Sequence, residues 1–160
     1  MSIIIGIDPG KSGAIAVLDD CCRVEIYDIG GSLVDAVTRL KQLSEVYDIT
    51  GVVIEKVHSF PKQGVASSFD FGCTYGHLRG ACIALGIPII AEPSPQQWKK
   101  AIFGSSISKL DKAGQKRAAR DKARELYPLT APMLARVKDA DKAEALLLCV
   151  YGARMNRGIV

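Results

Sequence analysis

The sequence has little histidine and few aromatic residues, and its cysteines follow no metal-binding pattern. It contains two histidines and five cysteines, and aromatic residues make up 6% of its 160 residues. Neither histidine stands at a metal-ligand spacing from a cysteine, and no CxxC pair occurs. An odd number of scattered cysteines is typical of reduced thiols in a cytosolic protein, and we expect most of them in the core. These features argue against a zinc site and against a disulfide scaffold.

Long apolar runs are also missing. No run reaches the ~18 residues that a membrane span requires, and the N-terminus lacks the charged-then-apolar pattern of a signal peptide. The chain is 48% hydrophobic with a formal net charge of +4, which is ordinary for a soluble protein. We therefore expect a single cytoplasmic domain that spans residues 1–160 and does not contact a membrane.

Basic residues are concentrated in one part of the chain. Between Gln96 and Pro128, nine basic residues accompany three acidic ones. Such a bias often marks only a solvated helix face, and the alternative is a polyanionic partner such as nucleic acid. The nine residues are Lys99, Lys100, Lys109, Lys112, Lys116, Arg117, Arg120, Lys122 and Arg124.

The spacing of apolar residues predicts an α/β fold. Strands are expected at 3–9, 13–18, 23–27, 51–55 and 87–91, and helices at 32–47, 67–85, 94–103, 112–127 and from 139 onward. The first three strands follow one another without a helix, so they form an antiparallel meander. The later strands alternate with helices. We therefore predict a mixed central sheet of about five strands with helices on both faces.

Three glycines recur in the second predicted helix. Gly72, Gly76 and Gly80 are four residues apart, so they align as a smooth stripe along one side of that helix. Glycine is unfavourable inside a helix, and the stripe therefore indicates close packing against a neighbour. That neighbour is either the sheet or the equivalent helix of a second copy of the chain.

The N-terminal stretch IIIGIDPGKSG superficially resembles a nucleotide-binding P-loop. That loop needs four residues between its first glycine and its Gly-Lys pair. Here Gly6 and Gly10 enclose only three, and Pro9 removes one backbone N–H that would bind phosphate. The stretch is therefore a strand that ends in Asp8 and is followed by a tight turn, and a nucleotide cofactor is not expected.

Carboxylates stand where the core would not otherwise accept them. Asp8 and Glu55 each end an apolar strand, and a charge at that depth is costly unless it is paired or binds a cation. Asp141 and Glu144 are three residues apart on an apolar helix, so they share one face of it. Asp139 is better placed as the N-cap of that helix, although it lies close enough to Asp141 to exchange roles.

Four carboxylates without histidine or thiolate partners form a hard-oxygen site. Such a site suits Mg²⁺ or Mn²⁺. Two of these ions, roughly 3.5–4 Å apart, are a common arrangement for phosphodiester hydrolysis. The pattern therefore favours a metal-dependent nuclease.

With these residues in place, the sequence resembles the RuvC family of Holliday-junction resolvases, especially its compact phage-type members, within the RNase H-like superfamily. The similar stretches are IIGIDPGKSGAIAVL, VVIEKVHSFPKQGVASSFDFGCTYGHLRGACIALGIP, PQQWKKAIFG and KDADKAEALLLCVYG. The resemblance implies an RNase H-like fold and an endonuclease that nicks four-way DNA symmetrically, leaving 5′-phosphate and 3′-hydroxyl ends. It also implies a homodimer, two Mg²⁺ ions per active site (or Mn²⁺ in their place), and the cytoplasm of a bacterial or phage-infected cell.

The resemblance also assigns residues by position. Asp8, Glu55, Asp141 and Glu144 match the acidic tetrad of the family, although the fourth member is often aspartate. Lys99 or Lys100 matches one lysine that contacts phosphate near the cut, and Lys116, or alternatively Lys112, matches a second. Arg117 and Arg120 extend this basic DNA-binding surface.

The loop after the fourth strand departs from the family pattern. Family members carry an aromatic residue there, where this chain has His58 and then Phe60. Either ring could stack on a base, His58 could instead lie near the metals, or both could simply pack the loop.

Three other functions remain to be distinguished. An actin-like sugar kinase or ATPase also opens with an aspartate and a glycine turn, but its two lobes need a far longer chain. A junction-binding protein of the same fold that does not cut, and a nuclease for flaps or other branched DNA, would differ from a resolvase in a cleavage assay.

Overall fold

The computed structural model describes residues 1–29, 32–56 and 64–159, which include a five-stranded sheet in the order β3-β2-β1-β4-β5. Strands β1 (Ser2–Asp8), β2 (Ala14–Asp19) and β3 (Val24–Asp28) pair antiparallel. Strands β4 (Asp48–Ile54) and β5 (Ile89–Ala91) extend the sheet in parallel, with β4 beside β1. The predicted mixed sheet with an antiparallel meander is therefore confirmed.

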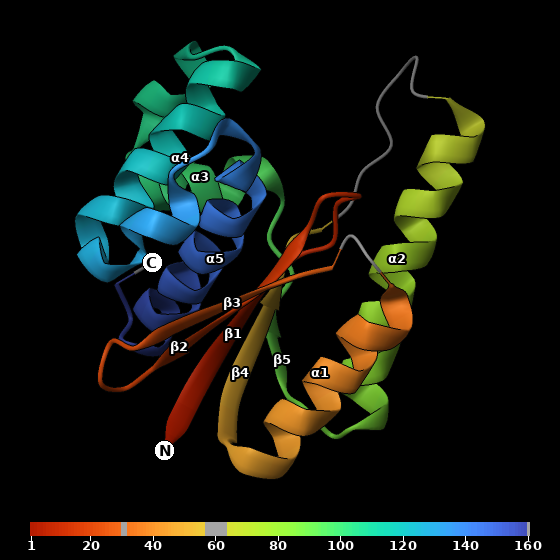
Figure 1. Ribbon diagram of the computed structural model, residues 1–160. Helices are drawn as coiled ribbons and strands as arrows, with labels where there is room; N and C mark the ends of the chain where they lie inside the picture. The colour runs from red at the N-terminus through yellow and green to blue at the C-terminus, as the bar shows by residue number, and fades with distance from the viewer. Residues whose placement is uncertain (30–31, 57–63, 160) are drawn as a thin grey trace.

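Helices cover both faces of this sheet (Figure 1). Helices α1 (Leu33–Val46) and α2 (Val65–Ala84) lie on one face. On the other face lie α3 (Pro95–Phe103), α4 (Lys112–Leu126) and α5 (Ala140–Asn156). Short 3₁₀ helices at Ser105–Lys109, Pro128–Leu134 and Val137–Asp139 connect these three, and the apolar pattern did not predict them.

The alternation of side chains along β1 separates two apolar clusters. Ile3, Ile5 and Ile7 pack into the cluster beneath α1 and α2. Because successive strand residues point to opposite faces, Ile4 and Asp8 face the cluster around α5. Strand period alone thus directs the carboxylate of Asp8 toward α5.

Two glycines allow α5 to lie very close to the sheet. A Cβ atom on Gly6 of β1 would stand 2.1 Å from the carbonyl oxygen of Ala145. A Cβ atom on Gly152 of α5 would stand 2.8 Å from Cγ2 of Val53. Neither position has room for a side chain, and the helix is therefore held directly over β1 and β4.

Several expectations need correction. Strand β4 begins at Asp48, three residues earlier than predicted, and its register against β1 shifts between Ile3 and Ile4. All five cysteines are free, but only Cys82 and Cys149 are buried, so most of the thiols lie outside the core.

No helix of the described residues combines the length and apolar character needed to cross a membrane.

The glycine stripe of α2 does not contact the sheet. A Cβ atom on Gly72, Gly76 or Gly80 would meet nothing within 4 Å among the described residues. These glycines are exposed, and the two nearer the C-terminus line a groove with Cys73 and His77. Of the two neighbours considered from the sequence, the sheet is excluded, and a second copy of the chain stays a prediction.

Candidate active site

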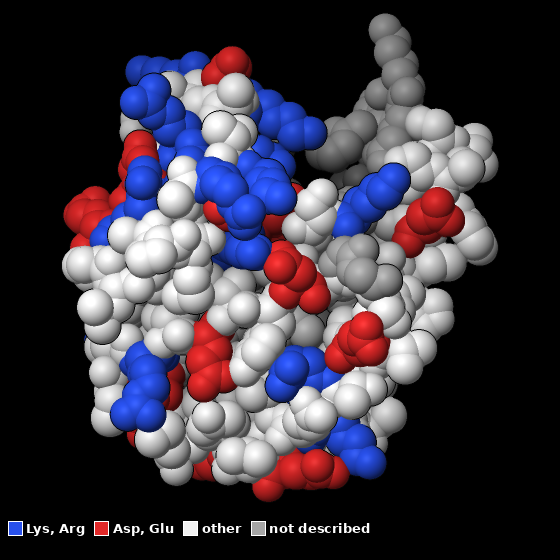
Figure 2. Space-filling model, viewed as in Figure 1, with Lys and Arg blue, Asp and Glu red and all other residues white. Residues whose placement is uncertain are grey.

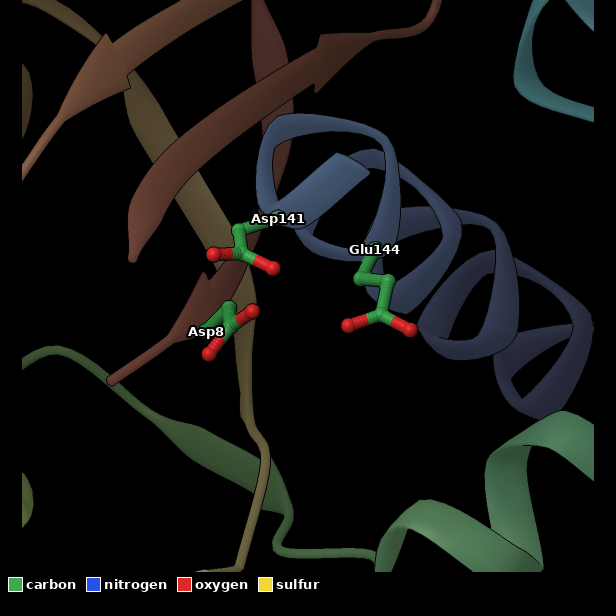
Figure 3. Close-up of side chains that lie close together, drawn as sticks. All are labelled: Asp8, Asp141 and Glu144. Carbon is green, nitrogen blue, oxygen red and sulfur yellow. The ribbon is translucent and has the colours of Figure 1, made fainter. Parts of the chain in front are cut away.

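Three of the four predicted acidic residues form a compact cluster. Asp8 comes from the end of β1, and Asp141 and Glu144 come from the start of α5 (Figure 3). One carboxylate oxygen of each lies within 4.8 Å of the others. Asp8 and Glu144 are buried, each with 5% of its surface exposed. The chain thus gathers three carboxylates at a depth where their mutual repulsion is unfavourable unless a cation compensates it.

The turn after β1 fixes the orientation of Asp8. The N–H of Gly10 donates a hydrogen bond to Oδ1 of Asp8 over 2.9 Å. The turn closes with a bond from the N–H of Gly13 to the carbonyl of Gly10, at 2.8 Å. A Cβ on Gly13 would stand 2.0 Å from the backbone oxygen of Asp8. The Asp-Pro-Gly-Lys-Ser-Gly stretch therefore forms a tight turn that holds the carboxylate of Asp8 in a fixed orientation.

Glu55 lies beside Asp8 but is held by a different contact. Its backbone N–H donates to the carbonyl of Ile7 over 3.0 Å, so Glu55 directly follows β4 and lies next to the end of β1. Its Oε1 accepts a 2.9 Å hydrogen bond from the indole N–H of Trp98. Glu55 is not part of the group whose oxygens lie within 4.8 Å of one another. The structure therefore brings together three members of the predicted tetrad and places the fourth at their margin.

Burial and like charges raise the pKa values of two of these carboxyls. Burial, followed by the charges of Glu55 and Glu144, holds the pKa of Asp8 well above its usual value, and the N–H of Gly10 only partly offsets this. Burial raises the pKa of Glu55 to about 7, although the indole N–H of Trp98 opposes the shift. A nearby cation would stabilise the ionised form of both carboxyls.

Two lysines partly neutralise the cluster. Nζ of Lys99 lies 2.7 Å from Oε1 of Glu144, and Nζ of Lys116 lies 2.7 Å from Oδ1 of Asp141. Partial burial opposes the charged form of Lys116, yet the carboxylate of Asp141 raises its pKa above the usual value. Of the rival pairs considered from the sequence, Lys99 and Lys116 are half-buried at the site, whereas Lys100 and Lys112 are exposed.

The donor set fits a divalent cation. Oε1 of Glu144 is buried and lies 2.7 Å from the ammonium of Lys99, which supplies the positive charge that a buried carboxylate needs. Asp8 is equally buried, and the ion pairs of the two lysines go to Glu144 and Asp141. Carboxylate oxygens from Asp8, Asp141 and Glu144 are the ligands that Mg²⁺ and Mn²⁺ prefer.

Two of the remaining predicted DNA-binding residues, Arg117 and Arg120, contact groups other than the clustered carboxylates. Arg117 pairs with Asp121 at 3.8 Å, and Arg120 donates to the carbonyl of Ala135 over 3.2 Å. Lys and Arg side chains nevertheless gather over the region of α4, at the upper left of the molecule (Figure 2). His58 and Phe60 lie outside the described residues.

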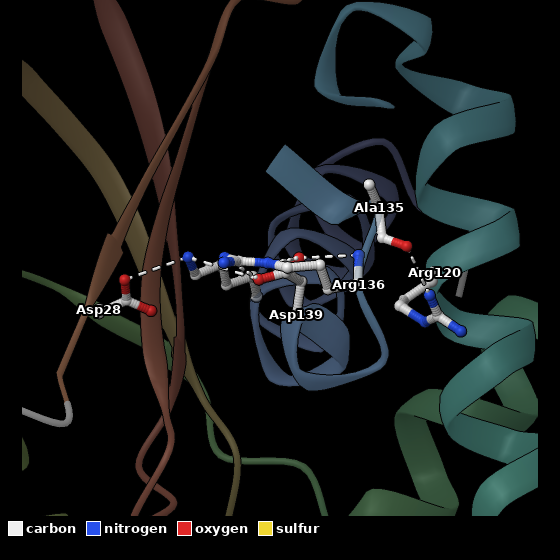
Figure 4. A network of polar contacts seen from close by, with 6 residues as sticks. Asp28, Arg120, Ala135, Arg136 and Asp139 are labelled. Atoms are coloured by element: carbon white, nitrogen blue, oxygen red, sulfur yellow. Dashed lines mark hydrogen bonds and ion pairs between the residues drawn. The ribbon is translucent and has the colours of Figure 1, made fainter. Parts of the chain in front are cut away.

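Asp139 takes a different role from the one expected. It precedes α5, but its side chain makes no capping bond to that helix. It is 1% exposed and accepts two bonds from the guanidinium of Arg136, at 2.9 and 3.0 Å (Figure 4). Lys142 joins Asp139 to the sheet, because its Nζ lies 3.8 Å from Asp139 and 3.1 Å from Asp28 of β3. Asp139 therefore anchors the start of α5 to the sheet and does not exchange roles with Asp141.

Sequence reasoning missed Trp98, Arg136 and Lys142. Trp98 is the only tryptophan of the chain and directly precedes Lys99, which is a usable signal for a buried residue beside the site. Arg136 and Lys142 each lie three residues from Asp139, a local spacing that could have suggested these ion pairs. Only the contact of Lys142 with Asp28 depends on how α5 meets β3.

Similarity to known proteins agrees with this geometry. No protein-family model matches the chain. The curated protein named crossover junction endodeoxyribonuclease RuvC from Nitratidesulfovibrio vulgaris (strain Hildenborough) is 28% identical over 123 residues, covering 69% of this chain and 72% of the relative. The protein of the same name from strain DP4 is 27% identical over the same length. The chain is a distant homologue of RuvC.

Solved RuvC structures share the fold along nearly the whole chain. The structure titled T. thermophilus RuvC in complex with Holliday junction substrate superposes with a TM-score of 0.60 and 21% identity, covering 97% of this chain and 96% of that chain. A second Thermus thermophilus RuvC structure gives the same TM-score and identity. The curated relatives confirm the resemblance to RuvC, and these structures confirm the fold predicted from the sequence.

Proposed function

We propose that this protein is a crossover junction endodeoxyribonuclease, which resolves four-way DNA junctions by metal-dependent phosphodiester hydrolysis. The observation that carries the proposal is the cluster of Asp8, Asp141 and Glu144, with lysines on two of its members, in a chain homologous to RuvC. Residues 1–160 act in this proposal as one nuclease domain. The products are symmetric nicks with 5′-phosphate and 3′-hydroxyl ends.

Asp8, Asp141, Glu144 and, from the margin, Glu55 are proposed to hold two Mg²⁺ ions, which Mn²⁺ could replace. When bound, such ions lower the pKa of a water nucleophile and stabilise the leaving oxygen. The chain supplies the orientation: β1 fixes Asp8, β4 fixes Glu55, and α5 fixes the other two.

Lys99 and Lys116 are proposed to contact the phosphate that is cut. In this structure they neutralise Glu144 and Asp141. Once a cation takes over that neutralisation, both ammonium groups are free to turn to DNA. Lysine serves here as a point charge on a flexible stem, so a short movement of the side chain is enough.

The basic surface beside the site is proposed to bind the DNA arms. Its residues are Lys100, Lys112, Arg117 and Arg120 together with the active-site lysines, while His58 and Phe60 stay candidates for stacking on bases. Contacts of this kind depend on phosphate neutralisation, so junction binding is expected to weaken steeply as salt rises.

Symmetric cutting requires two active sites, and a two-fold homodimer matches the symmetry of a four-way junction. We place part of the seam on the exposed glycine stripe of α2. Gly72, Gly76 and Gly80 leave the backbone of α2 open to a close neighbour, and no described residue of the same chain fills that space.

The test is cleavage of a labelled four-way junction beside a duplex of the same sequences, with Mg²⁺ or with chelator. Wild type is expected to make paired cuts in opposite strands of the junction only. Asp8→Asn should reduce the rate about a hundredfold or more, since it removes a ligand charge, while binding to the junction persists. Asp20→Asn, an exposed change in the β2–β3 turn, is the matched control.

Each other outcome has a distinct meaning. Tight junction binding without cuts in the wild type would identify a non-cleaving junction protein. Efficient cutting of flaps would broaden the substrate. Cutting that survives both chelator and Asp8→Asn would refute the metal mechanism.

A further inference from the structure

The indole of Trp98 makes a specific polar contact inside the site. Trp98 lies in α3 and is fully buried, and its N–H donates to Oε1 of Glu55 over 2.9 Å. An indole nitrogen can only donate, and a buried one needs an acceptor. That acceptor here is the carboxylate of Glu55, the residue that directly follows β4.

Helix α3 contacts two carboxylates through consecutive residues. Trp98 holds Glu55 from β4, and Lys99 pairs with Glu144 from α5 at 2.7 Å. Trp98 and Ile102 pack α3 into the apolar cluster around α5, and a capping box of Ser94 with Gln97 stabilises the start of the helix. The packed indole of Trp98 therefore fixes the orientation of the Glu55 carboxylate, whereas the contact of Lys99 is proposed to change when a cation binds.

We propose that Trp98 is a positioning residue for the metal centre. Its N–H donates to Oε1 of Glu55, and this bond holds the fourth carboxylate in a fixed orientation at the edge of the three-carboxylate cluster. The inference rests on the proposed function in one respect, namely that these carboxylates bind a divalent ion. It adds that an aromatic side chain orients Glu55 toward that ion.

Removing the N–H while keeping the ring separates positioning from packing. Mn²⁺ binding is measured by calorimetry on the full-length protein without DNA, for wild type, Trp98→Phe, Glu55→Gln and the double variant. Partners that orient a metal ligand typically contribute 10–100-fold in affinity. Trp98→Phe is therefore expected to weaken Mn²⁺ binding about tenfold. In the Glu55→Gln background the same change should have no further effect.

The double variant shows whether Trp98→Phe weakens Mn²⁺ binding through Glu55. An equal loss caused by Trp98→Phe with and without Glu55 would mean that the ring acts through packing, and the proposal would be wrong. Affinity within twofold of wild type for Trp98→Phe would also overturn it. Tyr127→Phe is the matched control, because it removes a polar atom from the same apolar cluster away from the carboxylates.

A measurement on the unmutated protein covers the case in which Trp98→Phe does not fold. The chain has one tryptophan, so its indole N–H gives a single resonance in a ¹⁵N-labelled sample. We expect slow exchange of this proton with solvent and a shift on addition of Mg²⁺ that is lost in Glu55→Gln. Rapid exchange, or a position unaffected by both Mg²⁺ and Glu55→Gln, would refute the proposal.

Asp8→Asn distinguishes the failure of this inference from failure of the proposed function. If Asp8→Asn binds Mn²⁺ as wild type does, the metal site itself is wrong. If Asp8→Asn loses binding and Trp98→Phe does not, only the role of Trp98 is wrong.

Discussion

The two faces of the sheet are built from the same strands but differ in what they bury. Toward α1 and α2, β1 contributes Ile3, Ile5 and Ile7 to an apolar cluster. Toward α5, the same strand contributes Gly6 and then Asp8, and α5 brings Glu144 to meet it. One face is thus ordinary core, whereas the other combines an apolar cluster with buried carboxylates.

The difference lies in how closely a helix approaches the sheet. Gly6 allows α5 to lie against β1, and this contact brings the two carboxylates of the helix to the end of the strand. On the opposite face, the glycines of α2 point away from the sheet and leave a surface open. Glycine therefore serves intramolecular packing on one face and, as proposed, an intermolecular contact on the other.

The largest expected effect comes from adding a methyl group where β1 and α5 are in close contact. Gly6→Ala places a Cβ 2.1 Å from a backbone oxygen of α5, which cannot move without shifting the helix. We expect the free energy of unfolding to fall by about 3 kcal/mol. Urea denaturation measures this, and a loss below about 0.5 kcal/mol, the range of neutral surface changes, would show that α5 is not tightly seated.

The second prediction concerns pH, and it applies only to the face that buries carboxylates. Glu55 has a pKa of about 7 when folded, against a reference value of 4.5. Between these values the folded protein keeps a proton that the unfolded chain has lost, and stability therefore falls as pH rises through this window. Without metal, we expect the free energy of unfolding to be about 2 kcal/mol lower at pH 8 than at pH 5.

Chemical denaturation in the presence of chelator at both pH values checks this difference. Glu55→Gln should reduce it and leave the part due to the raised pKa of Asp8, and Mg²⁺ should restore stability at pH 8 by binding the ionised carboxylates. A metal-free protein that becomes more stable as pH rises from 5 to 8 would contradict the burial of these groups.

A smaller effect is expected from the anchor of α5. Arg136→Ala removes the guanidinium from the buried carboxylate of Asp139 and leaves it the backbone N–H of residue 136 and the more distant ammonium of Lys142. Because the side chain of Arg136 is itself 62% exposed, we expect a loss of about 1 kcal/mol, well below that of a fully buried pair. Thermal unfolding compares it with Lys138→Ala, an exposed neighbour, and equal melting temperatures for the two variants would refute the anchor.

Much of this contrast between faces could be predicted from the sequence because it is local. Strand period directs Asp8 to one face, and the spacing of three residues puts Asp141 and Glu144 on one side of a helix. The order of strands and helices follows from the same periodicities. Glu55 is likewise recognisable as a carboxylate that follows an apolar strand, and the resemblance to RuvC then matched it and the lysines by position.

Other features depend on tertiary contacts that no periodicity encodes. The bond from Trp98 to Glu55 and the link from Lys142 to Asp28 each join residues far apart in the chain. The 3₁₀ helices between α3 and α5 are too short for an apolar pattern to appear. Asp139 looked like a cap because its position suits one, but the guanidinium of Arg136 offered a stronger partner.

The smallest effect on folding is expected on the open face. Gly76→Ala adds a methyl group that meets nothing within 4 Å in the described part of the chain, and alanine favours a helix over glycine by ~1 kcal/mol. The isolated chain should therefore become slightly more stable, whereas self-association should weaken if α2 forms the seam. Sedimentation measures the dimer, and Ser67→Ala, an exposed change on the same helix, serves as the control. Unchanged association in Gly76→Ala would move the dimer contact off this stripe and leave the glycines of α2 without a role.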